Sequence, residues 1–203
     1  MMQEIYRQFE HPHGALGALA GFVMSHRPSN KERNRWTVDL IAPGDEANVL
    51  EIGCGPGLAL SATCERVTRG RVIGVDHSAL MLAQAAKRNA SAIAAGRLQL
   101  NLGGLETLKS LRGDFDAVYS VNVAMFWKDR RAALAAIRSI MRPGGLIATT
   151  YQPRHRGAKS ADAFSFADRL SADMGACGFG EIRVETLNLH PMPAVCVLGR
   201  RGE

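Results

Sequence analysis

The segment with the clearest chemical meaning spans residues 49–57, where an apolar run is followed by three glycines at alternate positions. The run is long enough for one buried strand, and Glu51 is its single carboxylate. Glycine has no Cβ, so the turn after this strand can bring its backbone close to a ligand. A helix is expected to begin near Leu58, and a glycine turn between a strand and a helix is typical of nucleotide-binding sites. We therefore expect a nucleotide-like ligand at the end of this strand.

The spacing of the glycines favours one class of ligand over another. Dinucleotide sites carry G-x-G-x-x-G, whereas here the third glycine comes one residue early and Leu58 takes the expected place. Glu51, two residues before the first glycine, would repel a pyrophosphate and attract a cation. S-adenosylmethionine fits, because it has ammonium and sulfonium groups and no phosphate. A purely structural strand-turn-helix corner is the alternative interpretation.

The run Glu-Ile-Gly-Cys-Gly-Pro-Gly at residues 51–57 resembles the first motif of the class I S-adenosylmethionine-dependent methyltransferases. The resemblance continues over residues 72–76, 115–127 and 141–150. It implies an enzyme that transfers a methyl group from S-adenosylmethionine by in-line displacement and releases S-adenosylhomocysteine. It also implies an α/β fold, a Rossmann-like doubly wound seven-stranded and mostly parallel sheet with an antiparallel last strand and helices on both faces.

A second carboxylate, Asp76, follows a short apolar strand over residues 71–75. An acidic residue at the end of the second strand, about 20 residues past a glycine turn, accepts hydrogen bonds from ribose hydroxyls. The other interpretation is a helix N-cap, for which Ser78 is better placed. We therefore expect Asp76 to bind ribose, His77 to lie beside the adenosine, and Met81 to lean towards it from the next helical turn.

The resemblance also implies contacts after the third and fourth strands, expected over residues 97–102 and 114–121. Family members usually carry an aspartate that binds the adenine amino group, but Gly104 stands at that position here. Adenine contact is then expected from the backbone of Gly104 and Leu105, and Asn122 is expected to flank the methionine part of the cofactor. The candidate cofactor-binding residues are Glu51, Gly53, Cys54, Gly55, Gly57, Asp76, His77, Met81, Gly104, Leu105 and Asn122.

No residue is assigned as a catalytic base. His13, His26, Tyr151 and His155 are candidates, but their sequence surroundings do not distinguish them, and the acceptor atom stays open. No metal site is expected either, because the four cysteines form no C-x-x-C pair. We interpret them as reduced thiols, and the backbone of Cys54 as more important than its sulfur.

The elements that must position these residues alternate between helix and strand. We predict one domain over residues 1–203, with a Rossmann-like core at 47–203 and a helical segment at 1–46 that either closes over the cofactor as a lid or covers the sheet edge. Arg142–Gly145 is expected to end a helix before the fifth strand. The remaining helices are predicted at 14–24, 29–41, 58–67, 78–94, 128–141 and 160–174, and the remaining strands at 146–151, 182–189 and 194–198.

Composition limits the class of protein. The chain has 203 residues, 46% of them hydrophobic and 22% charged, which suits one globular domain. No apolar run of about 18 residues is present, so membrane insertion is not expected. We expect a cytoplasmic location.

The net charge of +6 permits acidic partners, but the arginines are spread along the chain. A small-molecule substrate is therefore favoured over nucleic acid, and oligomeric state is open. A cofactor-binding protein without transfer activity and a nucleic-acid methyltransferase are the alternatives.

Overall fold

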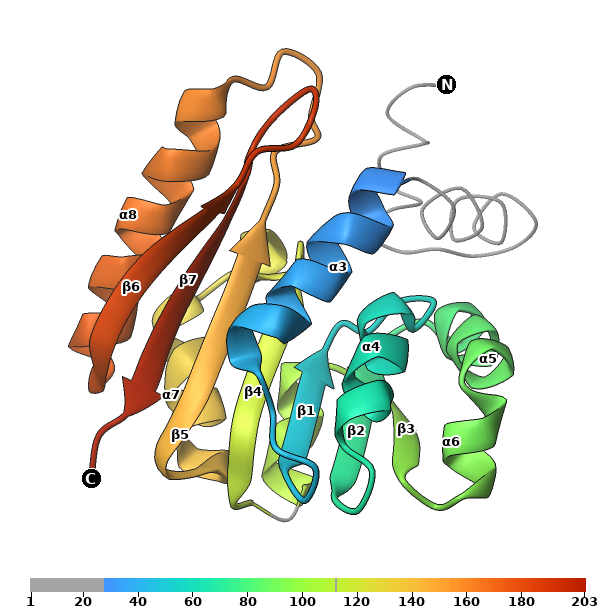
Figure 1. The fold of residues 1–203 in the computed structure, drawn as a ribbon. Helices are drawn as coiled ribbons and strands as arrows, with labels where there is room; N and C mark the ends of the chain where they lie inside the picture. The colour runs from blue at the N-terminus through green and yellow to red at the C-terminus, as the bar shows by residue number, and fades with distance from the viewer. Residues whose placement is uncertain (1–27, 112) are drawn as a thin grey trace.

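The computed structural model describes residues 28–111 and 113–203, which form one twisted sheet with helices on both faces (Figure 1). The strands are β1 (Asn48–Ile52), β2 (Arg71–Asp76), β3 (Leu98–Leu102), β4 (Phe115–Val121), β5 (Met141–Tyr151), β6 (Phe179–Leu187) and β7 (Ala194–Arg201). The α-helices are α3 (Pro28–Ile41), α4 (Leu58–Arg66), α5 (Ala79–Arg88), α6 (Ala90–Ala94), α7 (Arg130–Ile140) and α8 (Ser160–Ala176), and η1 (Leu105–Ser110) and η2 (Ala124–Phe126) are short 3₁₀ helices.

In the strand order β3-β2-β1-β4-β5-β7-β6, the first strand of the chain, β1, lies inside the sheet between β2 and β4. Strands β1 to β5 pair in parallel, and β7 runs antiparallel between β5 and β6. The predicted seven-stranded sheet with an antiparallel last strand is confirmed. The chain builds outward from β1 to β3, then crosses back to β4 beside β1. The carboxyl ends of β1 and β4 therefore flank the switch point, where open α/β sheets bind ligands.

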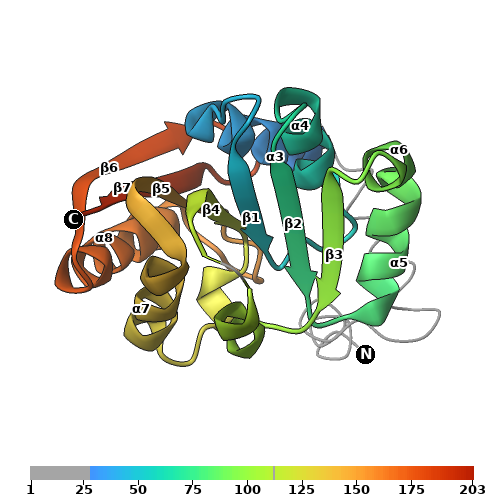
Figure 2. The same cartoon turned by 90° about the horizontal axis from the view of Figure 1, so that it is seen from below.

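Alternate residues of each strand face the two helical layers. Leu50 and Val118 belong to a core with α7 and α8, whereas Val49 belongs to a second core with α3 and α4. Figure 2 shows these two helix pairs on opposite sides of the sheet. The central parallel strands are buried on both faces, which explains why they read as continuous apolar runs rather than alternating ones.

Residues 78–94, predicted as one helix, form two. Helix α5 ends at Arg88, and Asn89 follows it as the C-cap residue, with its side-chain Nδ2 donating to the carbonyl of Ala85 at 2.9 Å. An asparagine that bonds to its own helix backbone competes with the helical hydrogen bonds, and the chain changes direction before α6. The prediction was wrong because alanine-rich composition masked this one residue.

The predicted stop at residues 142–145 is also different. Helix α7 ends at Ile140, and Met141 already pairs with Phe115 in the ladder. The next recorded pair joins Leu146 to Ala117, so the ladder is interrupted between the two pairs. The Arg-Pro-Gly-Gly run is therefore an irregular insertion near the start of β5 rather than a turn before it.

Helix α3 packs beside α4 on the face of the sheet, over β4 and β5. Val38 is fully buried in the second core, and the hydroxyl groups of Thr37 and Thr150 are 2.7 Å apart, which joins α3 to β5. The predicted helix at 14–24, the candidate bases His13 and His26, and the body of the proposed lid lie outside the described residues. None of the helices in the described part of the chain has the length and apolar character of a membrane span.

Candidate functional site

The glycine turn after β1 is fastened to the end of β2. The backbone amides of Gly53 and Cys54 both donate to the carbonyl of Val75, at 2.8 and 3.0 Å. The amide of Gly55 donates to Oδ2 of Asp76 at 2.8 Å. The turn and the carboxylate expected to bind ribose therefore form one hydrogen-bonded unit at the carboxyl edge of the sheet.

Two glycines of this turn face different surroundings. A Cβ added to Gly57 (φ 77°) would stand 2.5 Å from Nδ2 of Asn89 and 3.0 Å from Cα of Ala85, because α5 packs against the turn. A Cβ added to Gly55 (φ 51°) would meet nothing within 4 Å. The backbone of Gly55 thus faces open space beside Asp76. A ligand with hydroxyl groups, such as the ribose of S-adenosylmethionine, fits a cradle of this kind.

Alanine substitutions at these two glycines are expected to separate folding from binding. Both place a Cβ at a left-handed φ, at a cost of about 1 kcal/mol each. Gly57→Ala also forces α5 away, so it should lower the free energy of unfolding by about 2 kcal/mol or more. Gly55→Ala should keep the fold and weaken S-adenosylmethionine binding at least tenfold, because its methyl group occupies the cradle. Urea unfolding and calorimetry measure the two effects, and equal binding by Gly55→Ala and the natural chain would contradict the cradle.

Asp76 uses both oxygens to shape the site. Oδ1 accepts from the amide of Ser78 at 2.9 Å, and Oδ2 accepts from Gly55. Each carboxylate oxygen can accept a further hydrogen bond, so ribose hydroxyls have acceptors left. The side chain of Ser78, not that of Asp76, caps α5 by accepting from the amide of Met81. His77 is half-exposed, with Nδ1 3.9 Å from Oδ1 of Asp76.

The side chain of Met81 is 2% exposed. The structure thus places it in the protein interior, and its expected contact with adenosine stays a prediction.

Glu51 lies beneath the turn rather than in the cradle. Its side chain is 2% exposed, and Oε2 accepts from the hydroxyl of Tyr119 at 3.1 Å. The backbone of Leu60, in the first turn of α4, also hydrogen-bonds to it. Burial raises the pKa of Glu51 well above its ordinary value, and the nearby charge of Asp76 raises it further. The expected attraction between Glu51 and a cationic ligand stays a prediction.

Cys54 has an inert thiol. Its side chain is 4% exposed, and burial raises the pKa of the Cys54 thiol well above its ordinary value. A thiol held in its protonated form is neither a nucleophile nor a metal ligand. The contribution of Cys54 to the turn is therefore the backbone amide that bonds to Val75.

The carboxylate of Glu106 lies next to Gly104, the position at which family members usually carry an aspartate. The amide of Gly104 donates to Oε1 of Glu106 at 2.7 Å. An added Cβ at Gly104 would stand 2.9 Å from Oε2 of the same carboxylate. The Glu106 carboxylate thus fills the space next to Gly104, and Leu105 packs against the first core. Because Glu106 occupies the Gly104 amide, the expected adenine contact by that amide loses support.

Asn122 joins the ends of β4 and β5. It has a left-handed φ of 57°, which asparagine adopts more readily than most residues. Its Oδ1 accepts from the amide of Gln152 at 2.7 Å, and its Nδ2 donates to the carbonyl of Gln152 at 3.3 Å. The side-chain amide thereby extends the ladder by one step and holds the edge that faces the expected methionine group.

The two candidate bases in the described residues gain no support from their surroundings. The ring of Tyr151 packs 4.3 Å from that of Phe166, and burial raises the pKa of Tyr151 above its ordinary value. His155 is half-exposed, with Nε2 3.3 Å from Oδ2 of Asp162. Tyr151 is therefore a core residue and His155 a surface partner of Asp162.

Several residues that hold the turn were not identified from the sequence. Arg88 donates from Nε to the carbonyl of Pro56 at 2.9 Å, and Nδ2 of Asn89 donates to the carbonyl of Gly57 at 3.2 Å. Oδ1 of Asn89 accepts from the hydroxyl of Ser61 at 2.7 Å. A polar asparagine within an alanine-rich helix was the one available signal.

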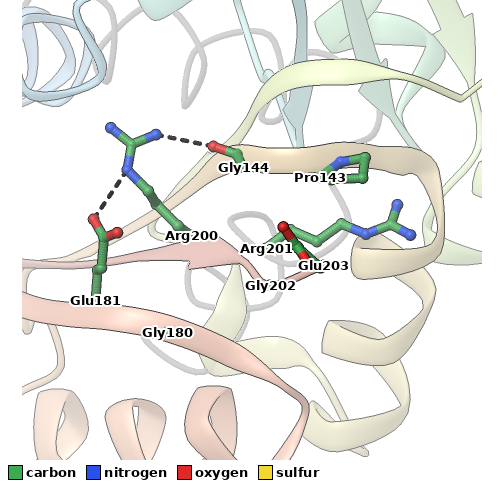
Figure 3. A pocket seen from close by; sticks show the side chains of 8 residues that line it. All are labelled: Pro143, Gly144, Gly180, Glu181, Arg200, Arg201, Gly202 and Glu203. Atoms are coloured by element: carbon green, nitrogen blue, oxygen red, sulfur yellow. Dashed lines mark hydrogen bonds and ion pairs between the residues drawn. The ribbon is translucent and has the colours of Figure 1, made fainter.

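A hollow near the C-terminus is a different feature (Figure 3). It lies where β5 and β6 begin and β7 ends, so it is at the opposite end of the parallel strands from the glycine turn. Arg200 there bonds to Glu181 at 3.1 Å and to the carbonyl of Gly144 at 2.9 Å. Arg200 and Glu181 are thus paired with each other, and the hollow contains none of the candidate cofactor-binding residues.

Known proteins with similar sequences and folds agree with this geometry. A family described as methyltransferase domain matches residues 49–145. The uncharacterised methyltransferase YdaC of Bacillus subtilis is 30% identical over 183 residues, which cover 90% of this chain and 98% of that protein. A trans-aconitate 2-methyltransferase of Deinococcus radiodurans is 30% identical over 137 residues, 67% of this chain and 50% of that protein.

Solved structures of methyltransferases have a similar fold. A Haemonchus contortus phosphoethanolamine N-methyltransferase, solved with S-adenosylhomocysteine, has a TM-score of 0.66 at 16% identity, covering 85% of this chain and 53% of that one. This likeness concerns the fold, whereas the YdaC match extends along nearly the whole of both sequences. The chain therefore belongs to the class I S-adenosylmethionine-dependent methyltransferases.

Proposed function

We propose that this protein transfers a methyl group from S-adenosylmethionine to a small-molecule acceptor. The observation that carries the proposal is the open backbone of Gly55 beside Asp76, at the carboxyl ends of the neighbouring strands β1 and β2. Bound there, the cofactor supplies an electrophilic methyl group on a sulfonium.

Four groups of this chain would hold the cofactor. The carboxylate of Asp76 accepts from the ribose hydroxyls, and the turn around Gly55 accommodates the methionine part. Glu106, whose carboxylate lies beside Gly104, is placed to accept from the adenine amino group. Asn122 fixes the edge next to the sulfonium. These residues bind and orient, which is the main requirement of an in-line displacement.

A small-molecule acceptor is supported by the relatives. Relatives named for a substrate include trans-aconitate 2-methyltransferases and a nocamycin O-methyltransferase. The match with this chain covers about half the length of those two trans-aconitate enzymes and less than half the length of the nocamycin enzyme. The described residues supply no group with the surroundings of a catalytic base.

Release of S-adenosylhomocysteine tests the proposal. The purified protein is incubated with labelled S-adenosylmethionine and a fractionated extract of small metabolites, with RNA and DNA in parallel reactions. Product and labelled small molecule are expected from the natural chain and strongly reduced with Gly55→Ala. Cofactor binding without turnover in any fraction would favour a binding protein, and labelling confined to RNA or DNA would overturn the small-molecule assignment.

A further inference from the structure

Two arginines meet beyond the carboxyl ends of β4 and β5, outside the cofactor cradle. Arg33 of α3 donates from Nη1 to the side-chain oxygen of Gln152, and Arg154 donates from Nη2 to the same oxygen at 2.6 Å. Arg33 is 5% exposed and Gln152 is 1% exposed. Two guanidinium groups thus converge on one buried, neutral oxygen.

The packing of α3 on β5 holds this arrangement in place. Four residues of a helix rise about 6 Å, and two residues of a strand rise about 6.6 Å, so the two elements can match step by step. Here the helix and the strand run in opposite directions. The step of four residues from Thr37 to Arg33 and the step of three residues from Arg33 to Asn30 each meet a step of two residues along the end of β5 and the residues that follow it. The polar pairs are Thr37 with Thr150, Arg33 with Gln152, and Asn30 with Arg154.

Within the described residues, the guanidinium of Arg33 has no carboxylate partner. Burial, and next the charge of Arg154, lower the pKa of Arg33 to about 9. None of the hydrogen bonds or ion pairs that Arg33 makes within the described residues involves a carboxylate, and its Nε has no acceptor there. A pKa of about 9 leaves the group charged at neutral pH. Burying such a cation without an anion is costly, and sites of this kind are commonly functional.

The arginine pair is connected to the reaction centre by one residue. The backbone of Gln152 bonds to both side-chain atoms of Asn122, the residue expected beside the methionine part of the cofactor. The side chain of the same Gln152 carries the arginine contacts and also donates from Nε2 to the carbonyl of Met192 at 2.7 Å. Arg154 is partly exposed, whereas Arg33 is buried.

We propose that Arg33 and Arg154 bind a carboxylate of the methyl acceptor, and that the substrate is therefore an organic acid. The side-chain amide of Gln152 is planar, and its oxygen accepts one N–H from each guanidinium, as an oxygen of a carboxylate would. A carboxylate adds a second oxygen and the missing negative charge, which suits the forked geometry of arginine. The identification of the bound anion as a substrate rests on the proposed function, whereas the anion site itself does not depend on it.

Anion titrations test the site without knowledge of the substrate. The full chain, with and without saturating S-adenosylhomocysteine, is titrated calorimetrically with acetate, succinate, citrate and inorganic phosphate at constant ionic strength set by chloride. At least one carboxylate is expected to bind with a dissociation constant of about 1 mM or lower. Arg33→Gln should weaken that binding tenfold or more. Arg35→Gln, on the same helix but exposed and paired with Glu65, is the matched control and should leave it unchanged.

Each outcome decides the proposal. Absence of carboxylate binding, or equal binding by Arg33→Gln and the natural chain, overturns it, and binding of phosphate alone overturns the assignment to carboxylates. If Arg33→Gln does not fold, Gln152→Glu places a carboxylate between the two arginines and should abolish citrate binding, so retained binding by this variant also overturns the site. Failure of the natural chain to bind S-adenosylhomocysteine would count against the proposed function, while the cofactor-free titration still reports on the arginine pair.

Discussion

Replacing Asp76 with alanine is expected to abolish measurable binding of S-adenosylmethionine. The carboxylate is the expected acceptor for the ribose hydroxyls, and hydrogen bonds to a charged group contribute about 1.5–3 kcal/mol each. Two such bonds correspond to a loss of affinity of 100-fold or more. The same substitution releases the Gly55 amide, which Asp76 holds at 2.8 Å, so the turn itself loses a support. Isothermal calorimetry with S-adenosylmethionine measures the effect.

The control for this variant separates ribose contact from loss of the turn. Asp76→Asn keeps one acceptor oxygen and the shape of the side chain but removes the charge. It should bind the cofactor more weakly than the natural chain and more tightly than Asp76→Ala. Because Asp76→Ala leaves the amides of Gly55 and Ser78 without their acceptors, we expect it to lose about 2 kcal/mol in free energy of unfolding while remaining folded. Unchanged affinity in a folded Asp76→Ala protein would refute the ribose assignment.

Glu51→Gln is expected to stabilise the fold at neutral pH and to weaken cofactor binding. Burial raises the pKa of Glu51 in the folded chain, so the folded state holds this proton more tightly than the unfolded state does. Folding stability from this group is full below the ordinary pKa of about 4.5 and is lost as pH rises towards the folded value. Glutamine does not titrate, so the variant should gain on the order of 1 kcal/mol at pH 7.5 and nothing at pH 4.

Urea unfolding at the two pH values measures this difference. Glu65→Gln, which removes an exposed carboxylate from the next helix, should show no comparable dependence on pH. Weaker cofactor binding by the more stable Glu51→Gln protein would show that the buried charge is kept for the ligand. A Glu51→Gln protein less stable than the natural chain at pH 7.5 would mean that Tyr119 and Leu60 fully compensate for burial of the carboxylate.

The fold was largely predictable because its central strands are buried on both faces. The apolar runs at Asn48–Ile52 and Arg71–Asp76 have strand length, end in glycine or acidic residues, and alternate with helical segments. Such patterns are local, and local patterns survive in a sequence read alone. The turn and Asp76 were likewise predictable as a unit, since the spacing between a glycine turn and the end of the next strand is nearly fixed in this architecture.

Other parts of the site depend on contacts that no local pattern records. Gln152 and Arg33 are 119 residues apart in the chain, and nothing near either residue predicts the other. Asn89 reads as one polar residue of an alanine-rich helix, yet it ends α5 and supports Gly57. Glu106 reads as an ordinary surface acid, and its return to Gly104 depends on the conformation of the turn. In each case, tertiary position rather than residue type determines the role.

The many bonds to the glycine turn have a thermodynamic consequence. Hydrogen bonds from within the chain, made by Val75, Asp76, Arg88 and Asn89, hold this turn. A preformed loop loses little conformational entropy when a ligand arrives, so more of the contact energy appears as affinity. The conformational entropy lost on binding then comes mainly from the residues that contact the methyl acceptor. Substitutions at those residues can change the selectivity between acceptors while the glycine turn stays the same.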